Sequence, residues 1–259
     1  MGHIRLGTLP DTKKWRAVVQ MIDGGADLLD IADGAARAAE RDLARMPDDP
    51  LFQFVLQILV VAPLEARTPQ YTDYLNELGV TEAETESVGS FLAALGRAID
   101  RKASEIGRTS DAGEMAKAAL LESLSVHLRD RLPTLFDPTA AEVRNALASF
   151  ANGQNFAVLA RDYFARLTYR SLDYFLSREL ANHTGEGKRF ASDASRTAFQ
   201  HDLAKHTFEA SKIVEAFAGG WYGKTVWQTQ SLDAKAIDGF SRYALRKMRS
   251  ELGRRRDGA

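Results

Sequence analysis

The stretch FAVLARDYFARLTYRSLDYFLSRELANH, from Phe156 to His183, decides the fold because it contains neither glycine nor proline. Its length predicts one long helix over about residues 155–183, which Gly185 closes. The tripeptide Asp-Tyr-Phe occurs twice, at Asp162 and Asp173, and a spacing of eleven residues is close to three helical turns. Both copies therefore share a face, and we expect a central core helix rich in packed aromatic side chains.

The rest of the chain also favours helices, because amphipathic stretches alternate with glycine and proline. We find no run of alternating β-branched residues that predicts a strand. The sequence therefore predicts an all-α fold, a bundle of about ten helices around the central one. The other expected helices cover residues 12–23, 26–46, 51–61, 69–78, 84–106, 112–131, 140–151, 193–217 and 232–252.

Capping signals support two of these helix starts. Asp111 with Glu114, and Thr139 with Glu142, have the capping-box spacing, in which each side chain bonds a backbone N–H at the other position. The segment AGGWYGKTVWQTQ that begins at Ala218 is expected to be irregular, because its two adjacent glycines favour a helix stop.

The composition is that of a globular protein, with 45% hydrophobic and 27% charged residues among 259. The chain has no cysteine, which excludes disulfides, thiolate catalysis and cysteine-ligated zinc. Its start lacks an apolar segment typical of a secretion signal, and the apolar run over residues 51–64 is too short to span a bilayer. We therefore expect a cytoplasmic protein with no membrane contact and no cofactor.

Charge is distributed unevenly along the chain. Residues 1–150 carry 16 Lys and Arg against 23 Asp and Glu, a net charge of −7, whereas residues 151–259 carry 18 against 12, a net charge of +6. This division indicates an anionic partner for the second half, or contact with an acidic surface that includes the protein's own. We expect an acidic N-terminal helical subdomain over 1–108 and a C-terminal one with a basic end over 109–259, or one domain containing both.

Three groups of residues have patterns that are typical of functional sites. The first, Ala218 to Thr225, fits a relaxed phosphate-loop pattern with Gly223 and Lys224 in place. A phosphate loop needs a strand before it and a helix after it, so that backbone N–H groups converge on the phosphate. The preceding segment continues a helix, so we expect these glycines to form a turn instead.

The second segment, His201-Asp202-Leu-Ala-Lys205, resembles the HD motif of metal-dependent phosphohydrolases. That resemblance implies a divalent metal held by His183, His201, Asp202 and Asp238. The alternative interpretation is a solvated helix face, on which Asp202 pairs with Lys205.

The third pattern is a group of basic residues in the C-terminal half, which could contact nucleic-acid phosphates without reading their sequence. The alternative is that these side chains pair with nearby carboxylates, as Arg242 could with Asp238. The group comprises Lys188, Arg189, Arg242, Arg246, Lys247, Arg249, Arg254, Arg255 and Arg256.

Our leading hypothesis is a non-enzymatic helical adaptor or accessory subunit of a bacterial multiprotein assembly, which binds other protein subunits or itself. Its anchor would be the exposed members of a set of aromatic and basic residues, since such side chains dominate interface energies. The set is Trp221, Tyr222, Lys224 and Trp227. Nucleic-acid binding through the basic C-terminal helix and a divergent HD-like phosphohydrolase are the alternatives.

Overall fold

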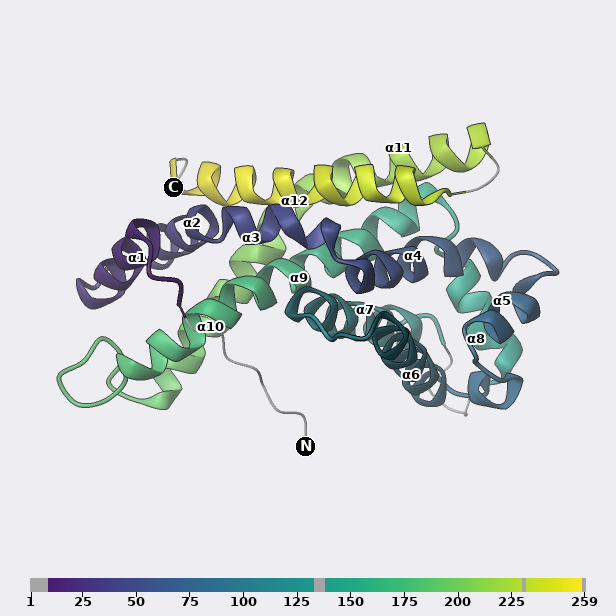
Figure 1. Ribbon diagram of the computed structural model, residues 1–259, viewed down its shortest axis with the longest axis horizontal. Helices are drawn as coiled ribbons and strands as arrows, with labels where there is room; N and C mark the ends of the chain where they lie inside the picture. Colours follow the sequence, from purple (N-terminus) through teal and green to yellow (C-terminus); the bar gives the residue numbers. More distant parts are fainter. Residues whose placement is uncertain (1–8, 133–137, 230–231, 258–259) are drawn as a thin grey trace. The chain divides into compact units, whose positions relative to one another are not determined.

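The computed structural model describes residues 9–132, 138–229 and 232–257 (Figure 1). These residues form twelve α-helices and two short 3-10 helices, without a β-strand, so the predicted all-α bundle is confirmed. In this part of the chain, no helix is both long and apolar enough to cross a membrane.

The helices follow one another closely along the chain. The first group is α1 (Lys13–Asp23), α2 (Leu28–Ala38), α3 (Glu40–Arg45), η1 (Met46–Asp48), α4 (Pro50–Glu65), α5 (Tyr71–Glu77), η2 (Glu82–Thr85) and α6 (Val88–Ile106). The second group is α7 (Asp111–Arg129), α8 (Ala140–Ala148), α9 (Gly153–Asn182), α10 (Asp193–Ala210), α11 (Lys212–Thr229) and α12 (Ala234–Asp257).

The chain forms two compact units, each built from separate stretches of sequence. The first unit comprises residues 1–45, 164–213 and 244–259, and the second comprises 46–163 and 214–243. Helices α9, α11 and α12 each contribute residues to both units. These compact units do not test the division expected near residue 108, which stays a prediction.

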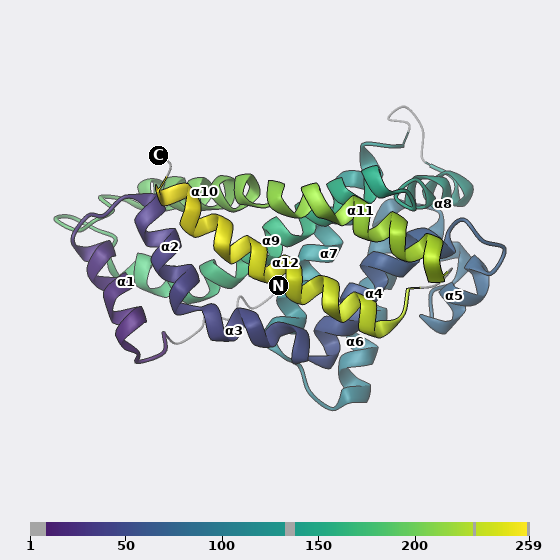
Figure 2. The ribbon, with the colours of Figure 1, turned by 90° about the horizontal axis from the view of Figure 1, so that it is seen from above.

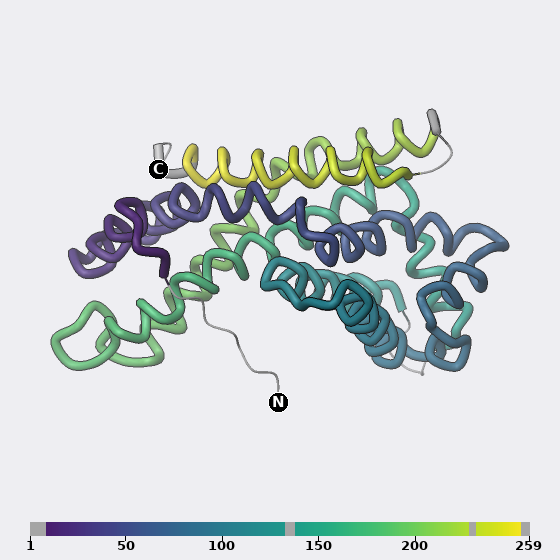
Figure 3. The backbone as a smooth tube through the Cα atoms, in the orientation of Figure 1, coloured from purple at the N-terminus to yellow at the C-terminus, as the bar shows by residue number. Residues whose placement is uncertain are grey.

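In the first unit, α1 and α2 pack against each other, and α10 contacts α2 (Figure 3). The buried Trp15 ring of α1 lies 4.9 Å from the ring of Phe175 on α9. Arg189, in the loop between α9 and α10, donates a hydrogen bond to the backbone carbonyl of Ala26. The N-terminal helices thus pack on the second half of the long central helix through aromatic and backbone contacts.

In the second unit, the apolar helix α4 packs on α6, α7 and α8, and Figure 1 shows α6 and α7 side by side. Asp49 caps α4 by accepting from the N–H groups of Leu51 and Phe52, both at 3.0 Å. Arg144 of α8 donates to the carbonyls of Ala66 and Thr68, which lie just beyond the C-terminal end of α4. Asp49 thus satisfies two N–H groups at the start of this buried helix, and Arg144 bonds the turn that follows its end.

The predicted central helix over 155–183 is confirmed as α9, which is buried around most of its circumference. The prediction that Ala218 begins an irregular segment is wrong, because α11 continues without a break through Gly219, Gly220 and Gly223. Gly219 serves a different purpose: a Cβ atom built there would lie 2.6 Å from the carbonyl oxygen of Gly153. Two glycines are therefore needed to bring the backbones of α9 and α11 into contact.

Several predicted helix boundaries also need correction. The expected helix over 26–46 is interrupted at Ala39, and that over 193–217 at Ser211, whose hydroxyl donates to the carbonyl of Phe208. Helix α4 runs past the expected end at residue 61 and includes Pro63, which has no N–H to donate to the carbonyl of Leu59.

The two predicted capping boxes had different outcomes. The box formed by Thr139 and Glu142 is confirmed at the start of α8. At the start of α7, the residue that caps is Ser110 rather than Asp111, because its side chain accepts from the N–H of Gly113. Ser110 is therefore the N-cap, because Asp111 is already the first residue of the helix.

We predict opposite stability effects for alanine at two adjacent glycines of α11. Gly219→Ala should lower the free energy of unfolding by about 1–3 kcal/mol, because its Cβ would meet the backbone of Gly153. Gly220→Ala should raise it by about 0.5–1 kcal/mol, because nothing lies within 4 Å of that site and alanine favours a helix. Chemical denaturation of both variants measures this difference, and equal effects would contradict the helix contact.

Candidate protein-binding surface

One face of α11 is buried in the second unit through aromatic packing. The Tyr222 ring stacks on Phe156 of α9 with centroids 4.1 Å apart, and the Trp221 ring stacks on Phe240 of α12, also at 4.1 Å. Phe217 lies 5.8 Å from the same Phe240 ring. Figure 2 shows α11 running beside α12, as these contacts require.

The opposite face of α11 faces solvent. From Ala216 onward its exposed described residues recur three or four positions apart, with Gly223 and Lys224 adjacent, and so form one stripe on the helix. Trp227, at one end of this stripe, is 82% exposed. We call this stripe the outer face of α11; it consists of Ala216, Gly220, Gly223, Lys224 and Trp227.

The predicted anchor residues lie on both sides of α11. Tyr222 is only 1% exposed, and its hydroxyl donates to the carbonyl of Val60 at 3.4 Å, so it is part of the core. Burial raises the pKa of Tyr222 well above its ordinary value of 10.0. Trp221 is half-buried, whereas Lys224 and Trp227 are exposed. Only the last two can therefore contribute most of their side chains to a partner.

The helical geometry of α11 also bears on the phosphate-loop pattern. The segment from Ala218 to Thr225 lies inside the helix, where backbone N–H groups bond to carbonyls four residues earlier. Those N–H groups are already satisfied and do not converge on a common point. The segment therefore lacks the geometry with which a phosphate loop binds nucleotide.

Two exposed lysines lie on α11 and in the first turn of the helix that follows it. Lys224 is exposed and forms no ion pair with the described residues, and the same is true of Lys235 in the first turn of α12. Asp233 precedes that turn, and its carboxylate accepts from the N–H of Ala236 at 2.7 Å as a helix cap. An exposed indole therefore lies on a helix whose neighbouring lysines have no internal counter-ion.

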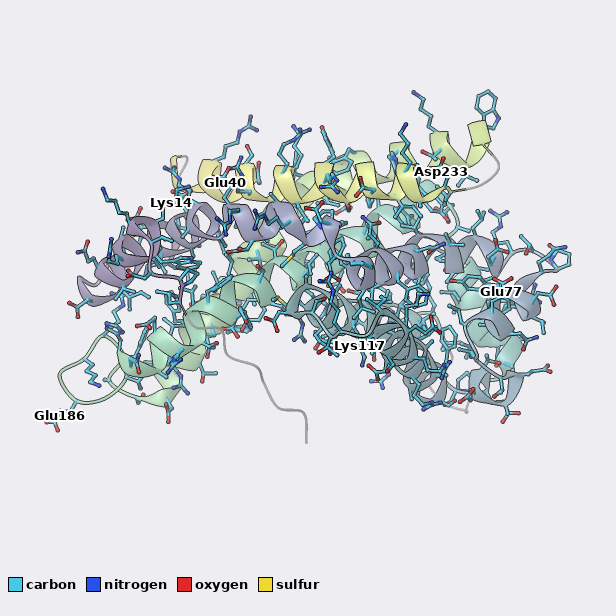
Figure 4. The ribbon with its side chains drawn as sticks, viewed as in Figure 1. Lys14, Glu40, Glu77, Lys117, Glu186 and Asp233 are labelled. Atoms are coloured by element: carbon cyan, nitrogen blue, oxygen red, sulfur yellow. The ribbon has the colours of Figure 1, made fainter. Side chains whose placement is uncertain are left out.

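A second charged surface of the same unit is acidic. Residues 68–96, which include α5 and η2, contain five carboxylates and neither Lys nor Arg. Four of these carboxylates are exposed and form no ion pair with the described part of the chain. We call them the acidic surface of α5 and η2; they belong to Asp73, Glu77, Glu82 and Glu86, of which Glu77 is labelled in Figure 4.

The fifth carboxylate, Glu84, is used inside the protein. It accepts from the backbone N–H and the hydroxyl of Thr81, both at 2.8 Å, and pairs with Arg97 of α6. These bonds, with the Thr81 N–H first, lower the pKa of Glu84 from 4.5 to about 2. Arg101 donates to the carbonyls of Leu78 and Gly79, so two cations, Arg97 and Arg101, lie beside an otherwise acidic surface.

Most basic residues predicted to contact nucleic acid have partners in the protein. Arg242 pairs with Asp48 at 2.7 Å and with Asp238 at 2.9 Å, which raises the pKa of its guanidinium. Arg249 pairs with Glu40, which also lies 3.4 Å from Lys14 (Figure 4). The expectation that the basic end meets the protein's own acidic residues is therefore met at Asp48 and Glu40.

The remaining basic residues of that group differ in their surroundings. Lys188 donates to the carbonyl of Asn182 and Arg189 to that of Ala26. Arg246 and Lys247 also interact with other residues, and Arg254 is exposed. The side chains of Arg255 and Arg256 lie outside the described residues.

The four residues implied as metal ligands have separate partners. His201 is exposed and lies 4.0 Å from Asp202, which also contacts Lys205 at 3.4 Å. His183 lies 3.8 Å from Asp23, and Asp238 accepts from Gln53 at 2.8 Å. Among the residues that the structure describes, no three His, Asp or Glu side chains form a group that could hold a metal ion.

One polar pair in the core had no signal in the sequence. His127 of α7 and Asp162 of α9 are nearly buried, with Nε2 3.6 Å from Oδ2, and the edge of the His127 ring meets Phe150. The two residues are far apart in sequence and belong to no shared motif, so only the fold could bring them together. The pair connects α7 to α9 inside the second unit.

We predict that Glu84→Gln changes the acid sensitivity of the protein. Because the pKa of Glu84 lies below its ordinary value, this carboxylate contributes stability above pH 4.5, which is lost as the pH falls towards 2. The variant should therefore lose less stability over that window, as measured by denaturation at a series of pH values. Arg97→Met should retain most of the effect, because the Thr81 N–H is the larger cause.

We also predict that replacement by alanine destabilises the protein at Trp221 but hardly at Trp227, both on α11. Trp221→Ala should lower the free energy of unfolding by about 2–4 kcal/mol, because it removes the stacked contact with Phe240. Trp227→Ala should change it by at most about 0.5 kcal/mol, because that ring touches mainly solvent. Thermal and chemical unfolding measure both, and a large loss in Trp227→Ala would show that this side chain is part of the core.

Comparison with known proteins adds no further residues to this surface. No protein-family model, curated protein or solved structure matches the chain. The outer face of α11 is therefore identified by its geometry, burial and charge alone.

Proposed function

We propose that this protein is a non-enzymatic helical adaptor or accessory subunit that binds another protein chain through the outer face of α11. The observation that carries the proposal is the 82% exposure of Trp227 on a helix whose other side is firmly packed. A tryptophan side chain left in water forgoes on the order of 4 kcal/mol of burial free energy. An exposed side chain of this size is typical of an interface residue.

The surroundings of Trp227 support a protein partner. Gly220 and Gly223 have open space where a side chain would stand, so a partner segment can approach the backbone of α11 closely. Lys224, one turn before the indole, adds an exposed cation that forms no ion pair with the described residues. Binding of nucleic acid is less well supported, because Arg242 and Arg249 are already engaged by carboxylates.

The proposal is tested by photo-cross-linking at position 227. Trp227 is replaced by p-benzoylphenylalanine in the full chain, expressed in the cells that make the protein, and Lys13, exposed at the start of α1, carries the same probe as a control. We expect a defined product from position 227 and none from position 13. The purified partner should then bind the native chain at least about tenfold more tightly than Trp227→Ala, a loss of about 1.4 kcal/mol.

Two results would contradict the proposal. One is the absence of a cross-link from a correctly folded chain labelled at position 227. The other is a partner that binds the native protein and Trp227→Ala equally well.

A further inference from the structure

We infer that the outer face of α11 binds a second copy of this chain, and that it meets the acidic surface of α5 and η2 on that copy. The inference rests on the proposed function, because it names the partner of the same surface. Its basis is the charge complementarity of two surfaces that every copy of the protein carries.

The first surface is apolar and cationic. Between Ala216 and Trp227 the only charged residue is Lys224, and Lys235 adds a second cation at the start of α12. Neither lysine forms an ion pair with the described residues. The nearest carboxylate in the sequence, Asp233, is used as the cap of α12. A partner that buries Trp227 must also approach Lys224, one turn away on the same helix, and carboxylates would offset the loss of its hydration.

The second surface supplies such carboxylates. Its four exposed acids form no ion pair in the described part of the chain, while Arg97 pairs with Glu84 and Arg101 bonds the carbonyls of Leu78 and Gly79. Half-buried Leu78 lies between Glu77 and Gly79 and offers an apolar contact for an indole ring. The surface therefore combines negative charge with an apolar spot, as a tryptophan flanked by lysines requires.

A pair of copies can make this contact twice. In a two-fold dimer, the outer face of α11 on each copy contacts the acidic surface of α5 and η2 on the other copy. Lys224 of either copy would therefore face the acids of its partner. Steering by opposite charges makes such an association sensitive to salt. Because the surfaces are small, we expect a reversible complex with a dissociation constant on the order of micromolar.

The test is analytical ultracentrifugation of the full chain over roughly 1–100 µM at low and at high salt. We expect species heavier than the 28.6 kDa monomer at low salt, and at least about a tenfold weaker association at high salt. Trp227→Ala, Lys224→Glu and Glu77→Lys should each weaken association at least about tenfold. Circular dichroism and thermal unfolding establish that each variant keeps its fold.

A charge exchange makes the test specific. The double variant Lys224→Glu with Glu77→Lys should recover association to within about threefold of the native chain, because opposite charges again face each other between copies. Lys13→Glu reverses an exposed charge elsewhere and should change nothing. No recovery in the double variant, or equal weakening by Lys13→Glu, would overturn the assigned contact.

The outcomes also separate this inference from the proposed function. A chain that stays monomeric at low salt, yet cross-links from position 227 to a different protein, overturns self-association and leaves the proposed function standing. A cross-link from position 227 to α5 or η2 of another copy supports both.

Discussion

The close backbone contact between α9 and α11 is the constraint on which the second unit depends. Gly153 and Gly219 have no side chains to separate the two helices, and a Cβ atom on either would lie 2.6 Å from the other's carbonyl oxygen. This approach lets Phe156 and Tyr222 stack almost parallel, at an interplanar angle of 19°. The aromatic core then extends to Phe240, so that the orientation of α11 follows from two missing side chains.

That orientation also decides which residues of α11 reach solvent. With Tyr222 and Trp221 directed to the core side, the 3.6-residue period of the helix places Trp227 and Lys224 on the outer side. A segment rich in glycine is a weak helix former by itself, so tertiary packing must stabilise it. The same packing thus produces both the helix and its exposed tryptophan.

The charged residues discussed above fall into two groups: those that form ion pairs within the chain, and those that form none with the described residues. Two basic C-terminal residues pair with acids from the N-terminal half, Arg249 with Glu40 and Arg242 with Asp48. Such surface pairs each contribute little stability, but they engage two of the cations that an outside anionic ligand would need. Among the described residues, the charges without an ion pair include Lys224 on α11 and four acids on α5 and η2, and we propose that these meet between proteins.

The sequence by itself determined the helical class, the long helix α9 and the cap at Thr139, because these depend on local periodicity and on side chains within one turn. It also placed Trp227 and Lys224 among the candidate binding residues. Only the tertiary structure decided that Gly219 supports a helix contact, that Tyr222 is buried and that Arg242 also pairs with Asp48. Each of these depends on residues distant in sequence. A local sequence pattern cannot indicate which backbone group or carboxylate lies beside a given side chain.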